Sequence, residues 1–407
     1  TPLLSASEYI SAQVTRRTAT LDQITSSLAQ GPPAIRWRKL SLGYPQIHPR
    51  YLCTSQQSAL HGCGEPPVGE SASITTEYPM PRKTSPKAST KTGLHPRNRH
   101  QGQYDFAALT SANPALRGHL INSPAGGSTL DFSKPDAVKA LNSALLKLQY
   151  KVRDWDIPPG YLCPPVPGRA DYLHTLADLL GDSHDGKIPT GKKLVGLDLG
   201  TGANLIYPLI GSHEYGWSFV GSDIDQTALD NAERLLDTNA TAAQRISLRL
   251  QPHNEHLFRG IIKPEEQFDF TLCNPPFHAS AEEARAANQR KWQQLNKQAE
   301  SKAGVLNFGG QASELYCVGG EAGFLSRMAI ESAEFGRQVF WFSSLVSNAD
   351  SLKQLPTQLR ELGATDVRIM DMAQGQKRSR LLAWTFLDKK QRRAWRKARW
   401  PAASKPD

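Results

Sequence analysis

Short apolar runs recur through the second half of the chain, and stretches with helical spacing separate most of them. Runs of roughly four to eight residues without polar alternation are typical of strands buried on both faces of a parallel sheet. We predict seven strands, over residues 194–199, 217–222, 246–250, 268–273, 339–342, 367–370 and 381–386, of which residues 246–250 and 367–369 alternate apolar and polar side chains. Strands that alternate with helices predict an α/β fold with a doubly wound, mostly parallel sheet.

Helical periodicity is clearest over residues 226–236, where four apolar residues (Ala228, Leu229, Ala232, Leu235) form one stripe. Further helices are predicted over residues 137–146, 171–180 and 323–335. The first of these lies in a segment that ends with rigid Pro-Pro pairs. We therefore expect a small, mostly helical module over residues 94–168, ahead of a sheet domain over residues 169–388.

Residues 1–93 lack sustained periodicity and are rich in Ser, Thr, Pro and Gln. Such a stretch buries too little apolar surface to offset its chain entropy, so we expect a disordered extension. Met80 opens a basic leader over residues 80–93. We expect residues 1–79 to be a dispensable upstream extension, and a chain starting at Met80 to stay active. Whether the native protein contains residues 1–79 is left open.

Basic residues are concentrated before the predicted helical module and after the predicted sheet domain. The formal net charge is +10, and residues 80–103 and 389–399 carry basic side chains without an acidic one. Each run alone is compatible with a solvated surface, but two of them around one domain favour a nucleic-acid partner. In the basic tail, residues 389–407, the expected contacts are Lys389, Lys390, Arg392 and Arg393.

The remaining composition excludes several classes of protein. The five cysteines are scattered and form no C-x-x-C pair, so we predict no disulfide framework, no zinc knuckle and no bound metal. No apolar run approaches the roughly 18 residues of a membrane-spanning helix, and the start of the chain lacks the pattern of a secretory signal. We expect a soluble, cytoplasmic protein that acts as a monomer and does not associate with membranes.

A glycine loop follows the first predicted strand. Gly200 and Gly202 let the backbone turn tightly and approach a ligand. Leu205 stands where a dinucleotide fingerprint has its third glycine, which counts against a bound pyrophosphate. S-adenosylmethionine fits better, since loop amides can hold its amino-acid end and Asp198 can meet its ammonium group. The predicted cofactor contacts in this loop are Asp198, Gly200, Thr201 and Gly202.

Two acidic residues, Asp223 and Asp225, follow the second predicted strand. A carboxylate at this strand end is placed to bind both ribose hydroxyls of the cofactor. We choose Asp223 for this role, because Asp225 directly precedes the helix at residues 226–236 and suits its N-cap.

The tetrapeptide Asn274-Pro275-Pro276-Phe277 follows the fourth predicted strand, where a doubly wound sheet opens its ligand crevice. Two fixed proline φ angles hold the Asn274 side chain and the Pro275 carbonyl in a rigid cup, whose two acceptors can face both hydrogens of one NH₂ group. Phe277 can stack on the attached ring, a contact worth about 1 to 3 kcal/mol per base. The pattern indicates methyl transfer to a planar nitrogen and favours the exocyclic amine of adenine.

The lone pair of such an amine is delocalised into the ring. Hydrogen bonds from both N–H groups to the cup favour a pyramidal nitrogen and raise its nucleophilicity, so no strong base is needed. In-line transfer leaves a cation that sheds its proton readily, and neutral Asn274 avoids the cost of desolvating a charged partner. Asn274 is expected to contact the cofactor as well, and we assign no catalytic role to His278.

Several motifs occur together in one known family. From about residue 94 to residue 386 the sequence resembles the large-subunit (23S) ribosomal RNA adenine-N6 methyltransferases and their eukaryotic relatives that methylate structured RNA hairpins. The resemblance rests on residues 94–99, 131–146 and 167–172, the glycine loop through Tyr207-Pro208, residues 274–277 and residues 318–321.

This resemblance implies a Rossmann-like class I methyltransferase sheet, S-adenosylmethionine as cofactor and large-subunit ribosomal RNA as partner. It implies that the module over residues 94–168 helps to form an RNA groove, with contacts from Arg97 and Arg99. It also places Arg169 where the family binds the cofactor carboxylate. The local sequence leaves a surface salt bridge open for Arg169.

Three alternatives stay open. An Asn-Pro-Pro-aromatic cup can hold any planar NH₂ group, so the substrate can also be the amide of a protein glutamine. A non-catalytic RNA-binding or ribosome assembly factor is a second alternative, although the intact Gly200, Gly202, Asp223 and Asn274 argue for activity. A dinucleotide-dependent oxidoreductase is disfavoured by Leu205.

Overall fold

The computed structural model describes residues 93–123, 126–276, 278–280, 282–283, 312–374 and 377–400. The chain divides into two units, residues 1–84 and 85–407, and every described residue belongs to the second. The predicted extension over residues 1–93 therefore lies outside the described residues, apart from Gly93.

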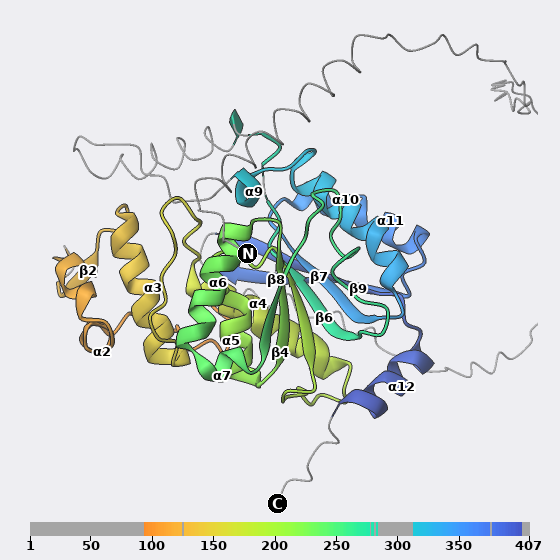
Figure 1. The fold of residues 1–407 in the computed structure, drawn as a ribbon, viewed down its shortest axis with the longest axis horizontal. Coiled ribbons are helices and arrows are strands. Elements are labelled where there is room, and N and C mark those ends of the chain that lie inside the picture. Colours follow the sequence, from red (N-terminus) through yellow and green to blue (C-terminus); the bar gives the residue numbers. More distant parts are fainter. Residues whose placement is uncertain are drawn as a thin grey trace, which may run out of the picture. The chain divides into compact units, whose positions relative to one another are not determined.

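A seven-stranded sheet forms the centre of the second unit (Figure 1). Its strands are β3 (Val195–Leu199), β4 (Ser218–Asp223), β5 (Ile246–Leu250), β6 (Phe268–Cys273), β7 (Val339–Val346), β8 (Asp366–Gln374) and β9 (Lys377–Thr385). Their order is β5-β4-β3-β6-β7-β9-β8, and β9 runs antiparallel to both of its neighbours while the other pairs are parallel. The seven predicted strands and the doubly wound, mostly parallel sheet are confirmed.

The central strands place the ends of two motifs side by side. Every residue of β6 and β7 is buried, as expected of strands covered on both faces. The register pairs Leu199 with Cys273 across β3 and β6, and Leu199 with Ser222 across β3 and β4. The glycine loop, Asp223 and Asn274 therefore emerge from the same edge of the sheet.

Helices cover both faces of this sheet (Figure 1). The larger core cluster includes α4 (Val166–Asp182), α5 (Ile206–Tyr215) and α6 (Gln226–Thr238), and a second cluster includes α10 (Gly320–Ser332) and α11 (Leu355–Glu361). Helix α5 has no counterpart among the predicted helices. Because residues on all of its sides are buried, it lacks the amphipathic stripe that reveals α6.

The segment before the sheet contains α2 (Phe106–Ala112), β1 (Leu120–Asn122), β2 (Ser128–Leu130) and α3 (Pro135–Tyr150). Leu141 and Leu145 of α3 belong to the same apolar cluster as α4 and α5. The core of this segment is thus continuous with that of the sheet domain. The short helices are α7 (Ala240–Ala243), α9 (Ala312–Leu315) and the 3-10 helices η1 (Pro114–His119), η2 (Ala333–Phe335) and η3 (Ala349–Leu352).

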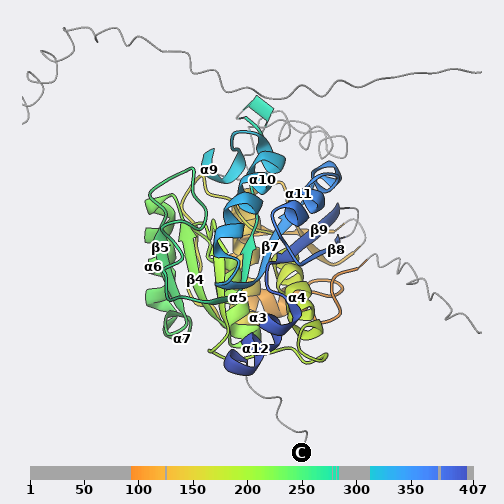
Figure 2. The ribbon, with the colours of Figure 1, turned by 90° about the vertical axis from the view of Figure 1, so that its right-hand side faces the viewer.

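The basic run that we expected to be a tail is helix α12 (Lys389–Arg399). It starts with a capping box between Asp388 and Gln391. The Nε1 groups of Trp395 and Trp400 both donate to the buried carboxylate of Asp269, at 2.7 and 2.8 Å. Figure 2 shows α12 at the end of the sheet away from α9 and α10. Within the described residues, no helix is long and apolar enough to span a membrane.

Candidate active site

The glycine loop after β3 bends toward the end of β4, where backbone hydrogen bonds hold it. The amides of Gly200 and Thr201 donate to the Ser222 carbonyl at 2.9 Å each, and the Gly202 amide donates to the Asp223 carboxylate at 2.8 Å. Both glycines have positive φ angles, +68° and +65°, which favour glycine over other residues. The loop and the carboxylate that follows β4 therefore form one structural unit.

Leu205 occupies the position of the missing third glycine and has a left-handed backbone with φ of +51°. A residue with a Cβ pays roughly 1 to 2 kcal/mol for this conformation. The Leu205 side chain is fully buried in the larger core cluster, and that burial offsets the cost.

Asp198 is buried at the end of β3, behind the glycine loop. Its Oδ2 accepts a hydrogen bond from Thr201 Oγ1 at 2.7 Å, whereas its Oδ1 has no partner among the described residues. Burial raises the pKa of Asp198 to about 7, because the charged form loses its hydration. A buried, unpaired carboxylate oxygen is an acceptor that a ligand can satisfy.

The two acidic residues after β4 have different surroundings. Asp225 caps α6 by accepting from the amides of Thr227 and Ala228, and it also accepts from the Tyr161 hydroxyl at 2.6 Å. Asp223 lies on the wall of a cavity, and burial raises its pKa. The prediction that Asp225 is the N-cap is confirmed.

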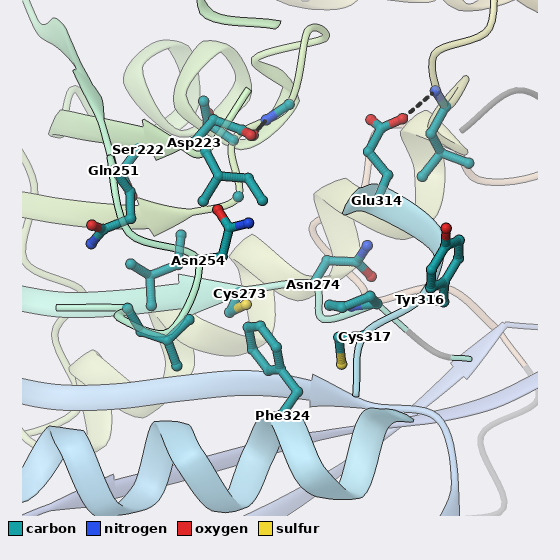
Figure 3. A pocket seen from close by; sticks show the side chains of 18 of the residues that line it. Ser222, Asp223, Gln251, Asn254, Cys273, Asn274, Glu314, Tyr316, Cys317 and Phe324 are labelled. Carbon is teal, nitrogen blue, oxygen red and sulfur yellow. Dashed lines mark hydrogen bonds between the residues drawn. The ribbon is translucent and has the colours of Figure 1, made fainter. Parts of the chain in front are cut away.

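The cavity has a volume of about 1010 Å³, and the glycine loop, Asp223 and Asn274 contribute to its wall. Figure 3 shows Asp223 and Asn274 on different sides of this space, with Phe324 rising toward it from α10. In the described part of the chain, no group of three or more His, Cys, Asp and Glu residues is arranged to hold a metal ion.

Asn274 is bonded to Arg169, which lies in the first turn of α4. Arg169 Nη1 donates to Asn274 Oδ1 at 2.8 Å and to the Tyr207 hydroxyl at 3.1 Å. The guanidinium has only donors, so this contact turns the oxygen of the Asn274 carboxamide toward Arg169. Arg169 is 9% exposed, which does not agree with the surface salt bridge that its local sequence left open.

Two buried tyrosines support this pair. The Arg169 guanidinium carbon lies 5.5 Å from the centroid of the Tyr207 ring, within range of a cation–π contact. Tyr172 packs edge-on against Tyr207 at 5.4 Å between centroids, and its hydroxyl accepts from the Cys273 amide at 3.3 Å. Helix α4 is therefore connected to the residue that directly precedes Asn274.

The rest of the tetrapeptide is only partly described. Pro276 contributes to the cavity wall, and Pro275 is buried. Phe277 lies outside the described residues, so base stacking on its ring stays a prediction.

Several wall residues were not predicted from the sequence. Gln251 and Asn254 follow β5, whose carboxyl end lies at the same edge of the sheet as those of β3 and β4. The strand-end rule that selected Asp223 could have found Gln251 as well. Tyr316 and Phe324 come from α9 and α10 regions that are distant in sequence from the other motifs, and no local signal identifies them.

Arg97 and Arg99, expected to contact RNA, are engaged by carboxylates of the chain itself. Arg97 donates to Asp178 at 2.7 Å and to the His174 carbonyl at 2.9 Å. Arg99 is paired with Glu214 at 2.5 Å. Both side chains keep exposed surface, 39% and 46%, so they are held in place without being sealed from solvent.

The four residues expected to bind RNA near the carboxyl end all lie on α12. Lys389, Lys390 and Arg393 are exposed. Arg392 is instead paired with Asp366 at 3.1 Å and lies over the Trp341 ring at 5.7 Å from its centroid. Arg392 therefore has a structural role in holding α12.

A family model described as RNA methyltransferase matches residues 88–388. Two curated relatives named Ribosomal RNA large subunit methyltransferase F come from Pseudomonas aeruginosa and Photobacterium profundum. The first is 58% identical over 329 residues, which cover 80% of this chain and 98% of the relative. The second is 48% identical over 338 residues, which cover 79% and 100%.

Solved structures show the same similarity. The hMettl16 catalytic domain in complex with the MAT2A 3′UTR hairpin 1 is 31% identical, with a TM-score of 0.62 over 73% of this chain and 96% of that chain. The N-terminal domain of human METTL16 in complex with SAH is 29% identical, with a TM-score of 0.57 over 72% and 99%. The sheet, the cavity at its carboxyl edge and these matches agree, and the chain belongs to the RNA methyltransferase family.

Proposed function

We propose that this protein transfers the methyl group of S-adenosylmethionine to the N6 amine of a specific adenine in large-subunit (23S) ribosomal RNA. The observation that carries the proposal is the position of Asn274, which shares one cavity wall with Asp223 and the glycine loop. The names of the curated relatives support ribosomal RNA of the large subunit as the substrate. The choice of adenine rests on the amine-binding pattern of the tetrapeptide.

The residues around the cavity fit the proposed cofactor. When bound, it supplies an electrophilic methyl group on a sulfonium. Asp223 lies on the cavity wall and is suited to the two ribose hydroxyls. Asp198 is buried behind the glycine loop and is not a wall residue, and we propose that its unpaired Oδ1 accepts from the amino-acid end of the cofactor. Both bonds from Arg169 to described residues come from Nη1, so its Nε and Nη2 groups can meet the carboxylate.

Asn274 can grip the amine while it is bonded to Arg169. A carbonyl oxygen has two lone pairs, so Oδ1 accepts from Arg169 with one and from an amine N–H with the other. The Pro275 carbonyl accepts from the second N–H. Because Arg169 fixes the carboxamide before the substrate arrives, little reorganisation is needed when the amine binds.

Two measurements on the purified full chain test this function. S-adenosylhomocysteine should raise the melting temperature by mass action, and NAD should leave it unchanged. Ribosomal RNA from cells that lack the protein should gain N6-methyladenosine in its large-subunit RNA when the protein and S-adenosylmethionine are added, as measured by mass spectrometry of nucleosides. Methylation of a protein glutamine without methylation of RNA would instead support the first alternative, and binding of RNA without any methylation would support a non-catalytic factor.

A further inference from the structure

Val318 and Arg327 lie on the wall of the cavity that contains Asn274, and neither has a role in the reaction described above. Val318 is 85% exposed, more than any other exposed large hydrophobic residue in the described part of the chain. An apolar side chain so exposed beside a cavity is available to a ligand.

A tight turn fixes the position of Val318. Gly319 and Gly320 have φ angles of +80° and +58°, and the Gly320 amide donates to the Cys317 carbonyl at 2.9 Å. A Cβ on Gly320 would come within 3.3 Å of the Ala279 amide nitrogen, so the turn packs closely against the chain that follows the tetrapeptide. The exposure of Val318 is therefore imposed by the backbone.

Arg327 lies on α10, and its Nη1 donates to the Val318 carbonyl at 2.9 Å. It forms no ion pair within 4 Å in the described part of the chain, in contrast to Arg97 and Arg99. The other arginine of the wall, Arg169, is buried and bonded to Asn274. Arg327 therefore presents a guanidinium group that forms no ion pair with a described carboxylate.

Most of the charged side chains on the cavity wall are acidic, so a phosphate group can bind only near one of the few basic ones. Asp223, Glu255, Glu282 and Glu314 also contribute to the wall and would repel a phosphate. An enzyme that acts on a base must draw that base out of its stack into the site, and the sugar and phosphates then remain at the rim. Guanidinium groups bind phosphate oxygens with paired hydrogen bonds.

We propose that Arg327 binds a backbone phosphate next to the target nucleotide, and that Val318 packs against the adjoining sugar. This inference rests on the proposed function. It makes Val318 and Arg327 substrate-binding residues that position the RNA, and it separates RNA binding at the rim from cofactor binding deeper in the cavity.

The test uses the full chain with protein-free large-subunit ribosomal RNA from cells that lack the protein. RNA affinity is measured between about 50 and 200 mM KCl, and S-adenosylhomocysteine affinity is measured alongside. Arg327→Gln should weaken RNA binding about tenfold at the lower salt concentration and reduce the slope of log affinity against log salt by about one. Arg327→Lys, which keeps the charge, should retain the slope.

Two further variants serve as comparisons. Val318→Ser should weaken RNA binding and leave the salt slope unchanged, because it removes an apolar contact only. Arg337→Gln removes an exposed charge that precedes β7, at the opposite edge of the sheet, and should change neither quantity. All four variants should bind S-adenosylhomocysteine and melt like the wild type.

The inference is overturned if Arg327→Gln leaves the salt slope unchanged, or if this variant loses affinity for S-adenosylhomocysteine. Either result leaves the proposed function intact as long as the wild type methylates the RNA. If the wild type neither binds nor methylates this RNA, the proposed function fails and the inference fails with it.

Discussion

Arg169 and Asn274 are 105 residues apart in the chain, yet Nη1 of the arginine donates to Oδ1 of the asparagine at 2.8 Å. This bond connects the first turn of α4 to the end of β6, and it sets the orientation of the carboxamide on the cavity wall. Arg169 thereby links the site expected for the cofactor carboxylate to the site expected for the amine.

Asn274→Ala should lower kcat about 100- to 1,000-fold, since it removes the acceptor that we propose holds the amine in the transition state. Affinity for S-adenosylhomocysteine, measured by calorimetry, should stay within about twofold. A parallel loss of cofactor binding would show that Asn274 shapes the cofactor site instead of gripping the amine.

Arg169→Lys should lower both kcat and S-adenosylhomocysteine affinity. A lysine lacks the planar guanidinium group that can bond to Asn274 and to the cofactor carboxylate at the same time. We expect kcat to fall about 100-fold through misplacement of the carboxamide. Tyr207→Phe is the matched control: it removes the other acceptor of Nη1, keeps the ring, and should cost only about threefold in kcat. If Arg169→Lys binds S-adenosylhomocysteine like the wild type, Arg169 does not hold the carboxylate.

Replacing Lys389, Lys390 and Arg393 together by Gln should reduce RNA affinity and its salt dependence if α12 contacts RNA. The melting temperature should change little, because these side chains are exposed.

Deletion of residues 389–407 is a poorer test of RNA binding by α12. It would also remove Trp395 and Trp400 from the carboxylate of Asp269 and destabilise the fold. Unaltered RNA binding in the triple variant would identify the exposed face of α12 as a solvated surface.

The buried histidines His100 and His174 should make stability depend on pH. Burial lowers the pKa of each to about 4, from 6.5 in the unfolded chain. Below pH 6.5 the unfolded chain therefore binds protons that the folded chain does not, and the free energy of unfolding falls as the pH drops toward 4.

Asp198 acts in the opposite direction, because its raised pKa of about 7 makes the folded chain hold a proton that the unfolded chain loses above 3.8. The two effects are separated by comparing His174→Gln with the wild type. The free energy of unfolding is measured with urea at about pH 7 and pH 5. The value at pH 7 minus the value at pH 5 should be smaller in the variant than in the wild type. An equal difference would mean that the pKa of His174 is the same in the folded and the unfolded chain.

The strands of the sheet and the helix α6 could be predicted because their signals are local. An apolar run or a stripe at helical spacing reports on burial within a few residues, and each of the seven predicted strands was found in the structure. Helix α5 escaped prediction because its first six residues, 206–211, are all buried and leave no polar face. The positions of Asp223, Gly200 and Gly202 at the cavity also followed from local spacing, since strand ends of a parallel sheet meet at one edge.

The interactions of the charged residues could not be predicted in this way. The carboxylate that pairs with Arg97 is 81 residues away, the one that pairs with Arg99 is 115 residues away, and the one that anchors Trp395 is 126 residues away. In the sequence each basic run therefore appeared unopposed, and α12 appeared to be a tail. Hydrophobic periodicity is a property of neighbouring residues, so it survives in a linear sequence, whereas the partner of a charge or of a hydrogen-bonding group depends on distance in space, and only the folded chain sets that distance.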